Sequence, residues 1–317
     1  MSKVTTTAKK EIRIRHSKYE NKRTFVLLSM CLPALILIFI FNYIPMGGLI
    51  LAFKNYDYSK GIFGSDWVWF DNFKFFFKSQ DALRVTVNTI AYNVVFIITS
   101  LVGALIIAVF LYEVRSKKLL KTYQTMYFFP YFLSWSVVSF IVFSFMEYDY
   151  GILNNILEKL GMEPILWYSE PKCWRFIIPV LNLWKTIGYN TIVFYAGIIG
   201  IDPTLYEAAA IDGANKYQIA RRIMVPQIGA LIVMMALLKV GKIFHSDFGL
   251  FYIVPLNAGS LYSATDVIDT YVYRALVTGG DTGMTVAIGF YQSLVGLCLV
   301  LLSNWLVKKF SEENAMF

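Results

Sequence analysis

The sequence predicts an all-α integral membrane protein with six transmembrane helices. Of its 317 residues, 57% are hydrophobic and only 16% are charged, and the mean hydropathy is +0.56. A soluble domain normally carries roughly a quarter charged residues. Six apolar stretches are long enough to cross a bilayer, and Lys and Arg concentrate in every second segment between them. We therefore expect lipid, rather than water, to face much of the surface.

Each predicted span contains roughly the 20 mostly apolar residues that a helix needs to cross a hydrocarbon core of about 30 Å. The first is too long for a signal peptide, and no clear small-x-small cleavage site follows it, so it is interpreted as a retained anchor. The fourth and fifth are the least apolar, because Lys185, Lys239 and Lys242 lie within or near them. The six spans are Phe25–Phe53, Val85–Tyr112, Tyr123–Met146, Phe176–Ile199, Ile228–Phe251 and Met284–Val307.

The distribution of basic residues predicts the orientation. Residues 1–24, 113–122, 201–226 and 308–317 together hold seventeen Lys and Arg, whereas the three segments on the other side hold nine. Because short cytoplasmic segments carry the excess of Lys and Arg, both termini of this multi-pass protein of the bacterial cell membrane are predicted to be cytoplasmic. The expected organisation is a basic tail, a membrane domain over residues 25–307 and a short C-terminal tail.

The net charge of +8 would suggest a nucleic-acid partner in a soluble protein. Here it mostly reflects topology and the attraction of the N-terminal segment to anionic headgroups of the lipid bilayer, so no nucleic acid is predicted. Enzymatic motifs are missing too. Gly241-Lys242 is followed by Ile243, so no phosphate-binding loop is formed. With His16 and His245 as the only histidines and three scattered cysteines, neither a metal nor a cofactor is predicted to bind.

The segment between the fourth and fifth spans predicts two short helices on the cytoplasmic side. Asp202 is a good N-cap, and Pro203 suits the first position of a helix. Gly213 is suited to the left-handed conformation that ends a helix. Asn215 can start a second helix, and Pro226 marks the return of the chain to the bilayer.

The first of these helices has the composition of a helix that binds in a protein groove. The small side chains of residues 208–210 let another surface approach the backbone closely. Leu205, Tyr206 and Ile211 offer apolar anchors, and Glu207 could pair with a basic partner. The residues alone are equally consistent with a plain cytoplasmic linker.

The spacing within this segment resembles the EAA motif of binding-protein-dependent ABC importers. The match departs from the family pattern only at Val225, where Leu is usual, and the change conserves an apolar side chain. Residues 266–274 and 287–293 resemble the carbohydrate importers of the maltose-transporter type, particularly the complex-oligosaccharide branch. The residues that carry the main resemblance are Glu207, Ala208, Ala209, Gly213, Ile223, Val225 and Pro226.

The resemblance implies a permease subunit that imports a sugar or oligosaccharide. A second homologous permease would complete a heterodimeric pore, and an extracellular solute-binding protein or lipoprotein would deliver the substrate. Two cytoplasmic ATPase subunits would bind ATP and Mg, and helix 203–211 would sit in a cleft on one of them. The coupling residues implied are Leu205, Tyr206, Glu207, Ala208, Ala209, Ala210, Asp212 and Gly213.

Side chains suited to binding sugars occur in the fourth and fifth spans. Aromatic rings can pack on sugar C–H surfaces, and polar groups can bind hydroxyls. Lys239 and Lys242 share one helix face, which would suit an acidic saccharide such as a uronide; they could equally pair with acidic groups of the partner permease. The candidate pathway residues are Trp184, Tyr189, Asn190, Tyr195, Lys239, Lys242, His245 and Asp247.

Three other functions remain open at this point. The chain could be a permease for a non-sugar ligand such as a peptide. It could be a membrane-embedded enzyme, although His245 and Asp247 give thin support for a catalytic cluster. It could also be a scaffold or sensor subunit that binds an ATPase and transports nothing.

Overall fold

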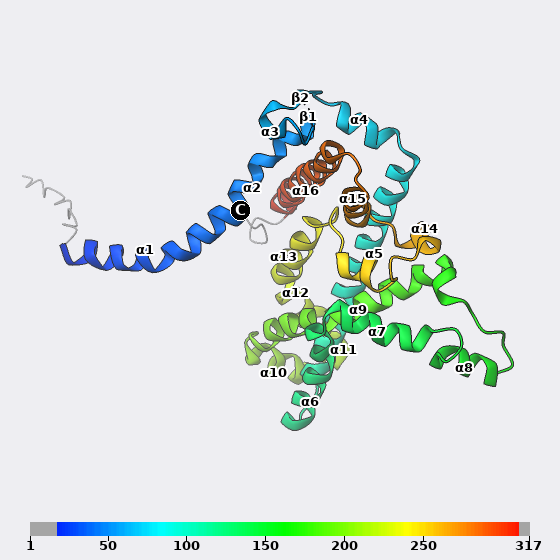
Figure 1. The fold of residues 1–317 in the computed structure, drawn as a ribbon. Coiled ribbons are helices and arrows are strands. Elements are labelled where there is room, and N and C mark those ends of the chain that lie inside the picture. The colour runs from blue at the N-terminus through cyan, green and yellow to red at the C-terminus, as the bar shows by residue number, and fades with distance from the viewer. Residues whose placement is uncertain (1–17, 311–317) are drawn as a thin grey trace, which may run out of the picture. The chain divides into compact units, whose positions relative to one another are not determined.

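The computed structural model describes residues 18–310, and these residues are almost entirely helical (Figure 1). Residues 1–17 and 311–317, which make up most of the two predicted tails, lie outside the described part. By length and composition, three described helices could cross a membrane, or five if each of two bent helix pairs is one span. The helical architecture confirms the all-α fold class. The chain divides into two compact units, residues 1–50 and 51–317.

The described part of the first unit is one run of helical turns. Pro33 lies inside its longest helix, and Pro45 lies near the start of a short one. The apolar side chains from Phe25 to Met46 are exposed all round, as expected for a helix that lipid or a partner subunit covers. The elements are α1 (Lys18–Ile38), η1 (Phe39–Tyr43), α2 (Ile44–Met46) and η2 (Gly47–Phe53), whose end belongs to the second unit.

The second unit begins with a small hairpin. Strand β1 (Lys54–Asn55) pairs antiparallel with β2 (Asp66–Trp67), and Lys54 lies opposite Trp67. The buried Asn72 side chain joins this hairpin to the next helix by donating to the carbonyls of Ala52 (2.9 Å) and Lys54 (3.0 Å). The helices here are α3 (Gly61–Gly64) and α4 (Asp71–Lys78).

Two long helices, α5 (Gln80–Tyr112) and α9 (Pro171–Ile199), pack along each other and form the centre of the second unit. α5 contains the second predicted span, and α9 contains the fourth. α9 is not among the helices apolar enough to qualify as a span by composition, since Asn182, Lys185 and Asn190 lie in its middle.

The third predicted span, Tyr123–Met146, is interrupted. It consists of α6 (Lys117–Phe128), η3 (Phe129–Phe132) and α7 (Trp135–Met146), and the chain bends by 99° between the helical segments on either side of the break. Two features explain the break. Pro130 lacks the N–H that a continuous helix needs, and the Ser134 hydroxyl accepts from the Val137 N–H (3.3 Å) and thereby starts a new helix.

The fifth predicted span, Ile228–Phe251, is also interrupted. α13 ends at Val240, residues 241–247 are not helical, and a π-helix, η6 (Gly249–Ile253), follows directly after residue 248. Asp247 starts this π-helix, because its carboxylate accepts from the Gly249 N–H at 2.9 Å. On its other side, α13 meets the preceding helical segment at a bend of 63°. The elements up to this break are α10 (Pro203–Ile211), α11 (Lys216–Ile219), η5 (Ala220–Met224), α12 (Val225–Gln227) and α13 (Gly229–Val240).

The remaining elements connect and cover these spans. The sixth predicted span lies within α16. The other remaining helices lie in the connections that follow α7 and η6. They are α8 (Ile152–Lys159), η4 (Trp167–Ser169), η7 (Gly259–Leu261), α14 (Tyr262–Thr265), α15 (Ile268–Val277) and α16 (Thr282–Phe310).

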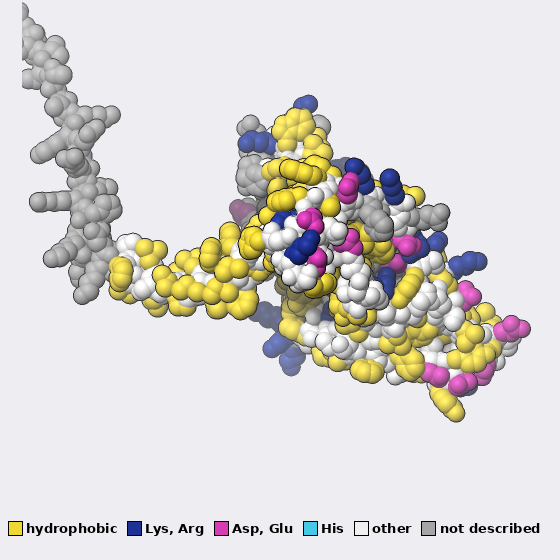
Figure 2. Space-filling model, turned by 45° about the horizontal axis from the view of Figure 1, so that its top comes forward, with side chains coloured by type: hydrophobic (Ala, Val, Ile, Leu, Met, Phe, Trp, Pro, Cys, Tyr) yellow, Lys and Arg dark blue, Asp and Glu magenta, His cyan; other side chains and the backbone are white. Residues whose placement is uncertain are grey.

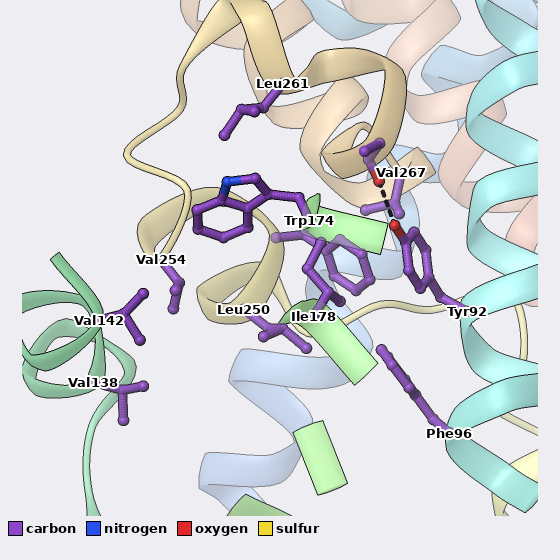
Figure 3. Packing of buried hydrophobic residues seen from close by; sticks show 12 residues of the cluster. Tyr92, Phe96, Val138, Val142, Trp174, Ile178, Leu250, Val254, Leu261 and Val267 are labelled. Atoms are coloured by element: carbon purple, nitrogen blue, oxygen red, sulfur yellow. Dashed lines mark hydrogen bonds between the residues drawn. The ribbon is translucent and has the colours of Figure 1, made fainter. Parts of the chain in front are cut away.

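A buried cluster joins α5, α7, α9 and η6 (Figure 3). Trp174 and Ile178 of α9 are fully buried in it, and Tyr92 of α5 also belongs to it. The Tyr92 hydroxyl donates to the Ala264 carbonyl at 2.8 Å and so ties α14 to the cluster. Elsewhere, apolar side chains cover much of the visible surface (Figure 2), and Phe140 of α7, for example, is 75% exposed. Such a surface suits lipid.

Candidate functional site

The first helix of the predicted coupling segment, residues 202–226, is α10. Asp202 caps it by accepting from the Thr204 N–H at 2.9 Å, and this hydrogen bond holds the pKa of Asp202 below its usual value. Pro203 is the first helical residue. Gly213 follows the helix with φ +77°, and its N–H donates to the Ala210 carbonyl at 3.1 Å. The local predictions for both ends of this helix are confirmed.

The second half of the segment is attached to the end of α5. Asn215 and Gln218 form a reciprocal capping box at the start of α11, with distances of 2.9 and 2.8 Å. The Lys216 ammonium lies 2.5 Å from the carboxylate of Glu113, which directly follows α5. This ion pair connects the second half of the segment to the end of a long central helix.

The structure divides the predicted coupling residues between two faces of α10. Tyr206 points inward: its hydroxyl donates to the Ile198 carbonyl (3.2 Å), and its ring lies 5.1 Å from that of Tyr112. Burial, and secondarily the neighbouring Tyr112, raises the pKa of Tyr206 to about 12. Ala209 is half-buried. The residues exposed at the surface are Leu205, Glu207, Ala208, Ala210, Ile211, Asp212 and Gly213.

A second candidate site is a cavity of about 450 Å³ between α5, α9 and α13, which we name the central cavity. It contains five of the predicted pathway residues. Within the described residues, no group of three His, Cys, Asp or Glu side chains is arranged to hold a metal ion. The lining residues are Asn93, Phe96, Ile97, Tyr131, Asn182, Thr186, Tyr189, Asn190, Met235, Leu238, Lys239, Lys242 and His245.

One wall of the central cavity combines an aromatic stack with polar side chains. The rings of Tyr131 and Tyr189 are stacked, with centroids 5.2 Å apart and an interplanar angle of 15°. Asn190 is 2% exposed, and its side-chain nitrogen has no hydrogen-bond partner among the described residues. A buried donor without a partner costs about 1–3 kcal/mol, so this amide is suited to bind a ligand atom.

Another part of the lining is basic. Lys239 and Lys242 both line the cavity, and no carboxylate of the described residues forms a salt bridge with either. His245 lies beside them, and its Nδ1 is 3.7 Å from the carboxylate of Asp269. Asp269 is itself held by the Ser246 N–H at 2.7 Å. The cavity can therefore offer positive charge to an anionic ligand.

Three predicted pathway residues do not line the cavity. Tyr195, like Tyr206, packs against the apolar cluster near the coupling segment. Asp247 instead caps η6 and accepts from the Trp135 indole N–H at 2.7 Å. Trp184 lies in the same stretch of α9 as Asn182 and Thr186 but is not part of the lining, and it is 39% exposed.

Sequence reasoning missed several lining residues, although for Asn182 and Thr186 a signal was present. These two lie on the same face of α9 as the predicted Tyr189 and Asn190, at the helical spacing i, i+4, i+7 and i+8. Tyr131 carried no such signal, because it approaches the cavity only through the break in the third span.

Comparison with known proteins identifies the family. The model of the binding-protein-dependent transport system inner membrane component matches residues 100–312, more than half of the chain. The chain belongs to this family. Protein LplB of Bacillus subtilis (strain 168) is 34% identical over 293 residues, covering 92% of each chain. The polygalacturonan/rhamnogalacturonan transport system permease protein YteP of the same organism is 33% identical over 285 residues, covering 90% of this chain and 88% of YteP.

Solved structures show the same architecture as this inner membrane component. A chain of a bacterial ABC transporter involved in the import of the acidic polysaccharide alginate aligns with a TM-score of 0.84 and 31% identity, over 92% of this chain and 98% of that one. A chain of the alginate transporter in complex with alginate pentasaccharide-bound periplasmic protein gives 0.83 and 31%, over 93% and 98%. The chain is thus a multi-pass ABC importer permease, a transport component and not an enzyme, as predicted.

Proposed function

We propose that this inner membrane component translocates acidic oligosaccharides through the central cavity. The observation that carries the proposal is the pair Lys239 and Lys242, which line the cavity without carboxylate partners in the described part of the chain. An ammonium group at membrane depth costs several kcal/mol unless it faces water or a counter-charge. A uronate carboxylate passing through the cavity would supply that counter-charge.

The other wall supports a saccharide in particular. The flat surface of the stacked Tyr131 and Tyr189 rings can pack against the C–H face of a sugar ring. The amide of Asn190 can donate to a hydroxyl. The names of YteP and of the alginate importer, both related to this chain, also refer to acidic polysaccharides.

The proposed assembly contains a second, homologous permease, two ATPase subunits that bind ATP and Mg, and an extracellular solute-binding protein. Both termini and the coupling segment lie in the cytoplasm. The exposed face of α10, with Glu207, Ala208 and Ile211, occupies a groove of an ATPase, and Tyr206 transmits its movement to α5 and α9. ATP binding and substrate delivery must each favour one of two gate arrangements for transport to have a direction.

Uptake by cells tests the proposed substrate. A strain in which the chain is replaced by the Lys239→Gln/Lys242→Gln variant is given labelled trigalacturonate or neutral galactotriose, two trisaccharides of equal length. We expect trigalacturonate uptake to fall about tenfold or more, because this factor corresponds to the loss of roughly one charge-assisted contact. Galactotriose uptake should change little.

The matched control is Lys118→Gln/Lys121→Gln, which removes two lysines three residues apart on α6, away from the central cavity. This control should retain trigalacturonate uptake. Equal loss of both sugars in the Lys239→Gln/Lys242→Gln variant would contradict the proposal and indicate that the two lysines pair with the partner permease instead.

A further inference from the structure

Lys185 lies in the middle of α9 and is bound to the break in the third span. Its ammonium donates to the Leu133 carbonyl and lies 3.4 Å from the carbonyls of Pro130 and Tyr131. These carbonyls end η3, where the helical hydrogen-bond ladder stops and acceptors lose their usual partners. The Pro130 carbonyl already accepts from the Leu133 N–H at 3.2 Å, so Lys185 is a second donor there and satisfies the carbonyls of Tyr131 and Leu133. The break in turn supplies the partners that a membrane-embedded ammonium requires.

Trp135, the first residue of α7 after the break, connects Lys185 to the interruption in the fifth span. The Lys185 ammonium lies over the Trp135 ring, 5.0 Å from its centroid, and the indole N–H donates to Asp247 at 2.7 Å. An indole is suited to this place between the two charges, because its face attracts a cation and its N–H edge attracts an anion. Asp247 starts η6 with its other oxygen.

The packing at this point leaves little room for independent movement. A β-carbon at Gly249 would lie 2.2 Å from Cδ1 of Trp135, so the indole is seated directly on the backbone of η6. One continuous set of contacts thus joins the end of η3, the start of α7, the middle of α9 and the start of η6.

We infer that Lys185, Trp135 and Asp247 form a latch that makes the two interrupted spans move as one unit during transport. They are positioning residues: Lys185 binds the backbone of Tyr131, whose side chain forms a wall of the central cavity. When the latch is intact, a movement that starts at α13 reaches the break of the third span through Asp247 and Trp135. When it is broken, one break can move without the other, and ATP is hydrolysed without transport.

The complete transporter, purified with its partner subunits and reconstituted in liposomes, provides the test. Trp135→Phe keeps an aromatic ring at this position and removes the donor to Asp247. Lys185→Met removes the ammonium at similar length, whereas Lys185→Arg keeps the charge and the donors. The chain offers a matched control at the end of α16, where Lys309 lies over the ring of Trp305 at 5.7 Å without contact to either break; the control variants are Lys309→Met and Trp305→Phe.

The readout is the number of ATP molecules hydrolysed per molecule of labelled trigalacturonate imported. We expect this ratio to rise about threefold or more in Trp135→Phe and Lys185→Met, and by the same factor in the double variant, as for residues that act through one interaction. Lys185→Arg and the control variants should keep the wild-type ratio. A purely structural role would lower uptake and hydrolysis in proportion; an unchanged ratio, or additive effects, would overturn the latch.

A second measurement needs no transported sugar. Spin labels replace Met126 on α6 and Phe140 on α7, which are 65% and 75% exposed on either side of the break, in a variant without the native cysteines. We expect one narrow distance distribution in each nucleotide state of the otherwise wild-type protein, and a broad one in Trp135→Phe. An identical distribution with Trp135→Phe would overturn the latch even if the transporter does not accept trigalacturonate.

Discussion

Gly188 of α9 lies directly against the carbonyl oxygen of Tyr127 in α6. A β-carbon at position 188 would be 2.0 Å from that oxygen and 2.8 Å from Cα of Phe128. Real side chains do not approach a backbone so closely, and backbone atoms cannot move aside as the end of a flexible side chain can. This contact brings the last turn of α6, and the break that follows it, against the centre of the second unit.

Replacing Gly188 by Ala should therefore destabilise the protein. We expect a loss of about 1–3 kcal/mol, the usual effect of forcing extra atoms into a packed interior. The control is Gly289→Ala in α16, where a β-carbon would meet no atom within 4 Å. Gly289→Ala should be neutral or slightly stabilising, because Ala is the better helix former. Thermal unfolding of the two purified variants compares them, and equal melting temperatures would disprove the prediction.

Asn190 and Asn154 are both 2% exposed, yet only one of them is satisfied. Asn154 accepts from the Ile165 N–H (3.1 Å) and the Trp167 indole (2.9 Å), and it donates to two carbonyls. The Asn190 nitrogen has no partner in the described part of the chain. Asn154→Leu should thus lower the melting temperature strongly, by leaving several buried groups unsatisfied at about 1–3 kcal/mol each.

Asn190→Leu should leave the melting temperature unchanged or raise it. Its effect should appear in transport: we expect the KM for trigalacturonate uptake to rise about threefold to tenfold, which corresponds to the loss of one hydrogen bond. Uptake kinetics and thermal unfolding of the same preparations separate the two effects. A destabilised Asn190→Leu variant with normal KM would show that this asparagine serves folding, and not the ligand.

Ala208 is exposed on the outward face of α10, so its size should matter only to a partner. Ala208→Leu should therefore leave the chain folded but prevent close contact between α10 and the ATPase. Ala208→Ser, with its smaller side chain, should disturb this contact much less. We expect ATP-driven uptake to fall about tenfold or more in the Leu variant, as for a lost central contact of an interface. Co-purification of the ATPase with each variant measures the contact; undiminished binding of the ATPase to Ala208→Leu would argue against this seat.

The raised pKa of Tyr206 predicts that the stability of the protein depends on pH in the alkaline range. Because burial raises its pKa from 10.0 to about 12, the folded protein keeps the phenol protonated where the unfolded chain would ionise it. The contribution of Tyr206 to stability is therefore fully present below pH 10.0 and is lost as the pH rises toward about 12. Over that interval the melting temperature of the wild type should fall relative to that of Tyr206→Phe. A constant difference between the two would refute the assignment.

Much of this protein could be predicted from local sequence. Apolar length located the helices that became α5, α9 and α16, because the lipid-facing surface of a helix depends only on its own side chains. The ends of α10 could also be predicted from local sequence, because the cap at Asp202 and the left-handed Gly213 involve neighbours within a few residues. The motif beginning at Glu207 predicted the family that the comparison established.

The site residues were predicted only in part. Asn190, Lys239 and Lys242 stand out in apolar surroundings and do line the central cavity, whereas Tyr195 was assigned from composition and packs elsewhere. A residue type shows that a side chain could bind a sugar. It does not show which direction that side chain faces once helices are packed.

The sequence by itself determined the helical spans, their caps and the coupling motif, since each depends on interactions between residues close in the chain. The tertiary structure alone decided what joins the breaks of the third and fifth spans. The backbone groups freed at Leu133, and the carboxylate of Asp247, find their partners in Lys185 and Trp135, more than fifty residues away in one case and more than a hundred in the other. No local pattern records such a pairing, because it exists only after α9 has packed beside the interrupted helices.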